Sequence, residues 1–174
     1  LPEAAQLVAE TDRLADSALA DVLDRPDHDA VADLAAELDE AFVADPPGTV
    51  TQGGLISEGY DDDLDEIIGD HEAALEWLET LPDREKRRTG ITHLSVDRNK
   101  TDGYYIQVGK SEAGEVPDRY DRLKSLKNSE RYTTDELNER ERQIFRLEER
   151  RGELEYELFT ELRERVAARA DLLQ

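Results

Sequence analysis

The sequence predicts a mainly α-helical fold, in which short core helices are followed by a long antiparallel helical arm with a small β-sheet inserted at its tip. Two apolar stripes with helical spacing, separated by a segment of alternating apolar residues, predict this order of elements. Composition favours the same fold, because only 37% of the 174 residues are hydrophobic and 38% are charged. That composition disfavours a thick globular core, whereas helix-on-helix contacts bury only one stripe per helix.

Residues 1–60 are expected to form two core helices and a connector. Pro2 suits the first turn of a helix, and apolar residues then follow at helical spacing. A second helix, with Asp27 as its cap, should run to about Phe42 before a proline-rich stop. Residues 49–60 contain three glycines and no helical period, which is typical of a connector.

The two sides of the arm are expected at residues 61–88 and 134–174. The first helix should begin near Asp61, where acidic side chains suit the positive end of the helix dipole, and Pro82 predicts a kink or a break near its end. The second should begin at Thr133-Thr134-Asp135-Glu136, which resembles a helix start with a threonine cap, and keep one apolar stripe to the end of the sequence. Such a long stripe needs a partner, so we expect the two helices to pair antiparallel in the manner of a coiled coil.

Residues 89–133 are expected to form the β-rich insertion. Apolar residues alternate on both sides of Lys100-Thr101-Asp102-Gly103, which predicts a β-hairpin whose turn uses the Asp-Gly pair. Residues 122–132 are expected to add one or two short strands.

The charge of the chain is distributed unevenly. The net charge is −22, yet residues 84–131, called the basic segment below, hold twelve lysines and arginines against eight acidic residues. A local change of sign of this kind suggests that one part of the molecule meets a polyanion while the rest stays solvated. The alternative is that the basic segment is only a chance gap in an acidic background.

Several classes of site are disfavoured. The chain has no cysteine, no phosphate-binding loop, no Gly-x-Ser-x-Gly motif and no histidine pair with metal-ligand spacing. Asp61, Asp63, Asp65 and Glu72 have the spacing of a calcium loop, but Glu66 stands where its sharp turn needs glycine, so an acidic helix start is the better interpretation. We therefore expect no catalytic and no metal site.

The setting of the protein is also expected from composition. No long apolar run and no signal-peptide pattern is present, so we expect a soluble, cytoplasmic protein. Acidic residues outnumber basic ones two to one and arginines outnumber lysines 17 to five, a balance that resembles the proteomes of salt-loving organisms. The absence of methionine and the uncapped apolar run at the end lead us to expect a fragment of a longer chain.

The basic segment is expected to contact a nucleic-acid backbone rather than to read bases. Lysine and arginine beside serine and asparagine at a sheet edge suit phosphate oxygens, and phosphate contacts carry no sequence information. Tyr104, Tyr105 and Tyr132 have rings that can stack on bases, but a place in the core of the sheet is the favoured interpretation.

An ordered series of motifs resembles the MutS family of DNA mismatch repair proteins, and the resemblance covers essentially all 174 residues. The motifs are Gly53-Gly54-Leu55-Ile56, Gly59-Tyr60-Asp61, Leu64-Asp65-Glu66, Thr89-Gly90-Ile91, Asn99, Gly103-Tyr104-Tyr105-Ile106-Gln107-Val108, Ser125-Leu126-Lys127-Asn128-Ser129-Glu130-Arg131-Tyr132 and Leu154-Glu155-Tyr156-Glu157-Leu158-Phe159.

The resemblance implies a noncatalytic part of a larger machine. MutS proteins are dimeric clamps that encircle duplex DNA, find mispairs with an N-terminal domain and signal repair through a C-terminal ATPase. This chain is similar to the part between those domains: the core helices, the lever arm and the clamp at its tip. No cofactor is expected in the fragment, whereas ATP and Mg would belong to the full-length protein.

The resemblance also implies partners and contact residues. The partners would be mismatched double-stranded DNA, a second copy in a full-length homodimer and a repair partner of the MutL type, with no membrane. The clamp would touch the DNA backbone without base specificity. The implied DNA-binding residues are Lys127, Asn128, Ser125, Lys124, Arg122, Arg98 and Asn99.

Two other functions stay open at this point. One is an acidic antiparallel helical hairpin that binds another protein and never touches DNA. The other is a MutS-like paralogue that acts in recombination, because a domain that reads mispairs is not part of this sequence.

Overall fold

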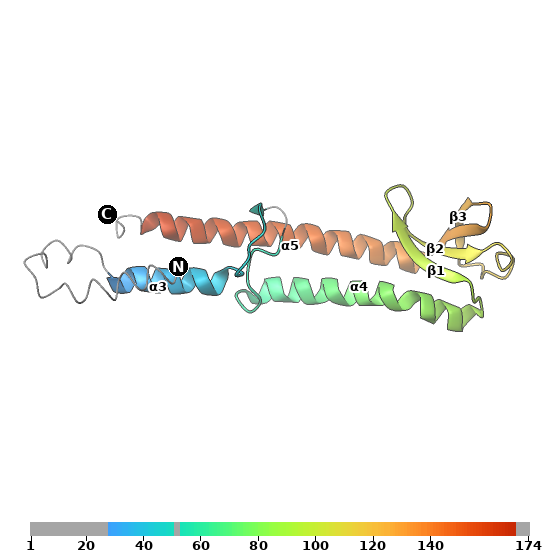
Figure 1. Ribbon diagram of the computed structural model, residues 1–174, viewed down its shortest axis with the longest axis horizontal. Helices are drawn as coiled ribbons and strands as arrows, with labels where there is room; N and C mark the ends of the chain where they lie inside the picture. Colours follow the sequence, from blue (N-terminus) through green and yellow to red (C-terminus); the bar gives the residue numbers. More distant parts are fainter. Residues whose placement is uncertain (1–27, 51–52, 170–174) are drawn as a thin grey trace, which may run out of the picture. The chain divides into compact units, whose positions relative to one another are not determined.

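The computed structural model describes residues 28–50 and 53–169 (Figure 1). These residues divide into two compact units. Among the described residues, the first unit combines those from 28 to 64 with those from 152 to 169, and the second spans Asp65–Arg151. The helix expected after Pro2 and the cap expected at Asp27 lie outside the described residues.

In the first unit, helix α3 (His28–Ala41) leads directly into the connector. Ala41 is fully buried, and Phe42 forms an isolated antiparallel bridge with Ile56. The ring of Phe42 lies 6.3 Å from that of Phe159 on helix α5 (Asp135–Ala168). The connector therefore folds back beside the end of α3, where the N–H of Val43 donates to the carbonyl of Leu55 (3.1 Å) and the N–H of Ser57 to that of Ala41 (2.8 Å).

A buried carboxylate holds the glycines of the connector. Glu155 on α5 has no exposed surface, and its two oxygens accept hydrogen bonds from the backbone N–H groups of Gly54 (2.9 Å) and Leu55 (3.0 Å). Gly54 has a φ of 78°, a conformation that favours glycine. Since a buried carboxylate is costly unless hydrogen bonds satisfy it, this contact specifies how the connector meets α5.

Helix α4 (Asp62–Thr89) supplies one side of the second unit. It begins where expected, since the Asp61 carboxylate accepts a hydrogen bond from the N–H of Leu64 (2.9 Å) as an N-cap. Pro82 lies inside the helix and does not break it, so of the kink or break expected there, the break is wrong. Gly90, with a φ of 79°, follows the last helical residue.

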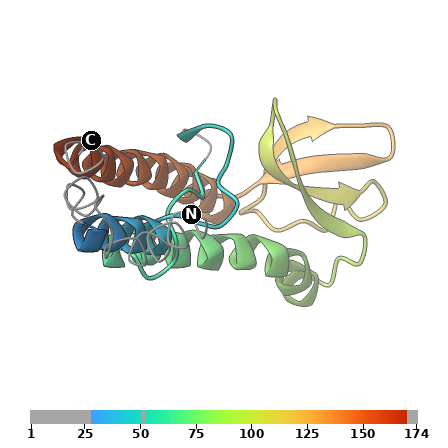
Figure 2. The same ribbon diagram turned by 60° about the vertical axis from the view of Figure 1, so that its left-hand side comes forward.

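The sheet of the second unit has four antiparallel strands in the order β1-β2-β4-β3 (Figure 2). Their bounds are β1 (Leu94–Asn99), β2 (Gly103–Gly109), β3 (Asp121–Ser125) and β4 (Ser129–Thr133). The expected hairpin is confirmed, with Asn99 opposite Gly103 across the turn, and residues 121–133 add two strands. β3 is an edge strand, and its pairing with β4 is irregular between Arg122 and Lys124.

One buried cluster joins the sheet to both helices. It contains Ala74, Leu78 and Leu81 of α4, Leu137 and Ile144 of α5, and the strand residues Leu94, Ile106, Val108 and Tyr132, together with Ile91 and Tyr120. Part of the apolar stripe of each helix is therefore buried in a core to which five helix residues and four strand residues contribute.

The predicted fold class is wrong. The described residues form three helices and a four-stranded antiparallel sheet, a mixed α and β fold instead of a long antiparallel helical arm with a small insertion. Within the second unit, extended close backbone contact between elements is confined to the strand pairs. The error arose because both apolar stripes were assigned to a helix–helix seam, whereas the sheet supplies much of the surface that buries them.

Helix α5 is continuous over its 34 residues and contributes to both units. It begins after the expected cap, since the hydroxyl of Thr134 accepts a hydrogen bond from the N–H of Leu137 (3.1 Å). No helix in the described ranges is long and apolar enough to cross a membrane.

Replacing Glu155 with alanine should lower the free energy of unfolding by roughly 2 to 4 kcal/mol, because the N–H groups of Gly54 and Leu55 lose their acceptors. Urea unfolding followed by circular dichroism measures the change. Glu153→Ala is the matched control, because Glu153 is exposed on the same helix and should change stability by less than about 0.5 kcal/mol. Equal effects of the two substitutions would contradict the role given to Glu155.

Replacing Gly103 with alanine should destabilise the hairpin by about 1 to 2 kcal/mol, because its φ of 68° is strained for any residue with a Cβ. The new Cβ would also meet a carboxylate oxygen of Glu141 at 2.5 Å, although that side chain has freedom to move. Gly114→Ala is the control, since a Cβ there meets nothing within 4 Å and its φ is not strained. In thermal unfolding, the melting temperature of Gly103→Ala should therefore fall clearly below that of Gly114→Ala.

Candidate nucleic-acid interface

The outer edge of the sheet presents the most accessible part of the basic segment. Every residue of β3 is exposed, as are Lys127 and Asn128 in the turn that leads to β4. The side chains of Lys124, Lys127 and Asn128 make no hydrogen bond or ion pair with any other residue in the part of the chain that the structure describes. These three side chains are therefore available to an outside partner.

Ser125 and Arg122 are held instead by a buried carboxylate. Glu130 on β4 is only 6% exposed, and its Oε1 accepts hydrogen bonds from Lys110 Nζ (2.6 Å) and from Ser125 Oγ (3.1 Å). Its Oε2 accepts one from the Tyr132 hydroxyl (2.6 Å) and lies 3.7 Å from Arg122 Nη1. Lys110 Nζ also donates to Ser125 Oγ (2.8 Å), so the group forms a closed network.

The electrostatics of this network follow from its hydrogen bonds. The ammonium of Lys110 and then the hydroxyl of Tyr132 lower the pKa of Glu130 from 4.5 to about 2. Burial, and then the carboxylate of Glu130, raise the pKa of Tyr132 to about 12. Glu130 therefore stays ionised and Tyr132 stays neutral across the physiological range.

Asn99 closes the β1–β2 turn rather than facing outward. Its Oδ1 accepts hydrogen bonds from the N–H groups of Thr101 and Asp102, both at 2.8 Å, and its Nδ2 donates to Asp102 Oδ2 (3.0 Å). Asp102 also binds Arg131 Nη1 at 2.7 Å, and the bonds from Asn99 and then Arg131 lower the pKa of Asp102. The amide of Asn99 is thus used within the turn.

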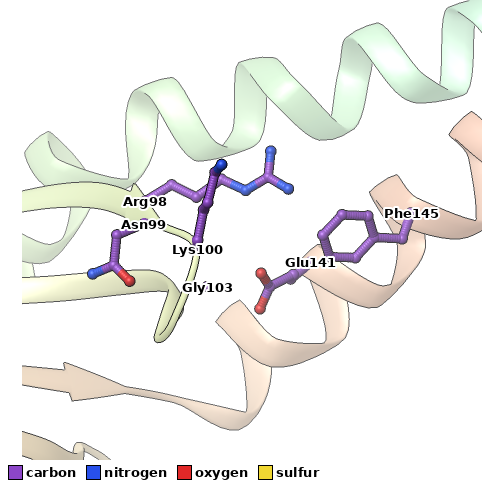
Figure 3. A pocket seen from close by; sticks show the side chains of 6 residues that line it. All are labelled: Arg98, Asn99, Lys100, Gly103, Glu141 and Phe145. Carbon is purple, nitrogen blue, oxygen red and sulfur yellow. The ribbon is translucent and has the colours of Figure 1, made fainter.

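Arg98 lies on the face of the sheet that α5 covers. Its guanidinium stands 5.2 Å from the ring centre of Tyr104 and 5.1 Å from that of Phe145 on α5, which are cation–π distances. Figure 3 shows Glu141 and Phe145 directed from α5 toward the hairpin turn, and Arg98 and Gly103 line an open pocket of about 590 Å³ with them. The aromatic contacts orient Arg98 within this pocket.

Much of the positive charge in the basic segment is neutralised internally. Arg119 and Arg88 pair with the buried Glu85, Lys110 and Arg122 with Glu130, and Arg131 with Asp102. Among the described residues of the sheet and its turns, the lysines without such a pair are Lys100, Lys124 and Lys127. A count of charges along the sequence therefore overstates what the surface offers to a polyanion.

The structure separates the seven residues expected to bind DNA. Lys124, Ser125, Lys127, Asn128 and Arg122 come together at the β3 edge, whereas Arg98 and Asn99 belong to the β1–β2 hairpin. Sequence reasoning missed Lys110, whose N–H donates to the carbonyl of Asn128 (3.0 Å) and whose ammonium joins the Glu130 network. In the sequence, only the alternation of Ile106, Val108 and Lys110 indicates that Lys110 continues the line of strand β2. That alternation places Lys110 beside Asn128 only when the pairing of β2 with β4 is known.

Comparison with known proteins identifies the family. A family model described as MutS family domain IV matches residues 59–150, which include α4, the whole sheet and the first part of α5. The chain belongs to the MutS family.

Similar proteins from several organisms are named as MutS DNA mismatch repair proteins. DNA mismatch repair protein MutS 1 of Haloarcula marismortui is 70% identical over the whole chain, which spans 19% of that relative. MutS 1 of Halobacterium salinarum is 54% identical, with all of this chain and 20% of the relative covered. MutS of Halothermothrix orenii is 43% identical over 79% of this chain and 15% of the relative.

The relatives are much longer than this chain. It spans about a fifth of the length of its two haloarchaeal relatives quoted above. The acidic, arginine-rich composition agrees with the haloarchaeal origin of those relatives, as the sequence predicted.

The stability gained from ionised Glu130 should be lost in acid. An unfolded carboxyl near its ordinary pKa of 4.5 takes up a proton before the folded one, whose pKa is about 2, so stability present above pH 4.5 declines toward pH 2. The difference in unfolding free energy between the parent chain and Glu130→Gln should therefore shrink over this range. Urea unfolding at a series of pH values measures it, and a difference that stays constant down to pH 2 would contradict the assignment.

Proposed function

We propose that this chain is a noncatalytic part of a MutS-type mismatch repair protein that contacts the backbone of duplex DNA through the β3 edge and the β3–β4 turn. The observation that carries the proposal is the exposure of Lys127 and Asn128, whose side chains have no partner among the described residues. Lys124 lies exposed beside them on β3. A lysine and an amide at an exposed turn suit the phosphate oxygens of a duplex.

The contact is proposed to be non-specific with respect to base sequence. Tyr105 and Tyr132 are 6% and 3% exposed, so their rings are not available to stack on bases. Arg131 covers the ring of Tyr105 at 4.1 Å and is itself paired with Asp102. The exposed residues that remain at the β3 edge include the cations Arg122 and Lys124 and the polar Ser125, beside Asp121 and Leu123. Cations and hydroxyls favour phosphate contacts over recognition of base edges.

Salt sets a limit on this interaction. Attraction between lysines and phosphates weakens steeply as the salt concentration rises, and few lysines at this edge are unpaired. Hydrogen bonds from neutral groups such as Asn128 are less sensitive to screening. In a salty cytoplasm they would carry a larger share of the binding, and the chain alone should bind DNA weakly.

The remaining roles come from the family resemblance and are part of the same proposal. The whole protein would act as a homodimer on mismatched DNA, would hydrolyse ATP with Mg and would signal to a MutL-type partner. Helix α5 is a reasonable route by which DNA binding here affects a distant ATPase domain, because it is continuous and contributes to both units. A MutS-like paralogue acting in recombination would use the same backbone contact.

Anisotropy titrations of a labelled duplex with the 174-residue chain test the proposal. Lys127→Ala should weaken binding at low salt and reduce the slope of log K against log salt by about 1, because one phosphate contact is lost. Asn128→Ala should weaken binding with little change in slope, because the amide carries no charge. Lys86→Ala on α4 removes the same charge away from the β3 edge and should have the smallest effect.

The same titrations can contradict the proposal. If the parent chain fails to bind duplex even at low salt, an acidic module that binds another protein is the better function. If Lys86→Ala weakens binding as much as Lys127→Ala, the attraction is diffuse and the β3–β4 turn is not the contact.

A further inference from the structure

Lys110 lies next to the turn proposed to meet DNA, although it is 17 residues earlier in the chain than Lys127. Its backbone N–H donates to the carbonyl of Asn128 at 3.0 Å. Its side chain is 48% exposed, and the ammonium is fixed by Glu130 Oε1 at 2.6 Å and Ser125 Oγ at 2.8 Å. Lys110 is therefore both exposed and held in place, whereas Lys127 in the neighbouring turn has no hydrogen bond or ion pair among the described residues.

The hydrogen-bonding capacity of Lys110 is not exhausted by these contacts. An ammonium has three donors, and the structure uses two of them, one on Glu130 and one on Ser125. Arg122 flanks the same carboxylate at 3.7 Å, beyond a direct hydrogen bond, and its side chain is 64% exposed. The exposed Lys110 and Arg122 thus both lie beside the buried carboxylate of Glu130, and the three side chains together carry a net charge of +1.

We propose that Lys110 is a further phosphate-contacting residue and that Glu130 is the positioning residue that presents Lys110 and Arg122 to the DNA backbone. The proposal rests on the proposed function and extends the contact from the β3–β4 turn to the end of β2. Ser125 serves between them as a link, since its hydroxyl accepts from Lys110 and donates to Glu130.

Holding a lysine in place has a physical advantage for binding. A lysine side chain loses considerable rotamer freedom when it binds, and a lysine that is already held loses less at that moment. A buried carboxylate can hold it only if its own oxygens are satisfied, and both oxygens of Glu130 accept hydrogen bonds here. The buried hydroxyl of Tyr132 donates one of these hydrogen bonds, so the carboxylate of Glu130 is itself held in place.

Two roles for Glu130 predict opposite effects of its neutralisation. If Glu130 only masks positive charge, Glu130→Gln adds one unit of net positive charge to the DNA-facing edge and should tighten binding. If Glu130 positions Lys110 and Arg122, the same substitution should weaken binding despite the added charge. The sign of the change in affinity therefore separates positioning from masking.

The first arm of the experiment removes the lysine. In duplex titrations of the 174-residue chain, Lys110→Ala should weaken binding on the order of fivefold and reduce the salt slope by about 1, as expected for one lost phosphate contact. Lys86→Ala is again the matched control. In this variant Glu130 keeps its hydrogen bonds from Ser125 and Tyr132, and circular dichroism checks that the chain is folded. Binding equal to that of the parent overturns the contact.

The second arm neutralises the carboxylate. Glu130→Gln should weaken binding about threefold, whereas Glu115→Gln, an equal charge change at an exposed position in the loop before β3, should leave binding equal or slightly tighter. In a Lys110→Ala background the effect of Glu130→Gln should become smaller, because part of it acts through Lys110. Unchanged or tighter binding by Glu130→Gln, or full additivity with Lys110→Ala, overturns the positioning role.

Two further comparisons keep the result interpretable. If Glu130→Gln does not fold, Tyr132→Phe removes one hydrogen bond from the same carboxylate without changing the charge, and binding equal to the parent would then overturn positioning. Lys127→Ala separates this inference from the proposed function. If Lys127→Ala weakens binding and Lys110→Ala does not, only the inference fails, whereas a chain that binds no duplex overturns both.

Discussion

Three glutamates are buried in the described part of the chain, and the arrangement of the segments around them depends on how each carboxylate is satisfied. A carboxylate removed from water is tolerated only where hydrogen bonds replace the lost solvent. Glu155 takes its donors from the connector backbone, Glu85 from Arg119 and Tyr120, and Glu130 from Lys110, Ser125 and Tyr132. These bonds add to the apolar contacts of the same segments, in which Leu55, Tyr120 and Tyr132 are buried.

Two of the buried carboxylates are joined through aromatic rings. The hydroxyl of Tyr120 binds Glu85 on α4 at 2.5 Å, that of Tyr132 binds Glu130 on β4 at 2.6 Å, and the two ring centres are 5.8 Å apart. Both rings belong to the core that the helices share with the sheet. Continuous packing therefore connects α4 to the edge proposed to meet DNA. The exposed side chains of that edge extend from a packed part of the sheet.

Local patterns in the sequence predicted the individual elements well. The helix start near Asp61, the threonine cap before Asp135, the Asp-Gly hairpin turn and the one or two strands expected in residues 122–132 all depend on neighbours within a few residues. The structure has both helix starts and the hairpin turn, and it has two strands in the last segment. The predicted fold class was wrong because an apolar stripe specifies that a helix is buried on one side without specifying what covers it. A kink or a break was expected at Pro82, and the break is absent because α4 continues through that residue.

The sequence by itself determined the elements, the family resemblance and the place of the basic segment, because each of these follows from residue type and spacing along the chain. Only the tertiary structure decided which positive charges are available. Glu85, Glu130 and Asp102 neutralise arginines and a lysine at sequence separations of 3 to 34 residues, and Asn99 turns inward to close a hairpin. Ion pairs of this kind require the register of the strands and the burial of the carboxylates, and both arise only when the chain has folded.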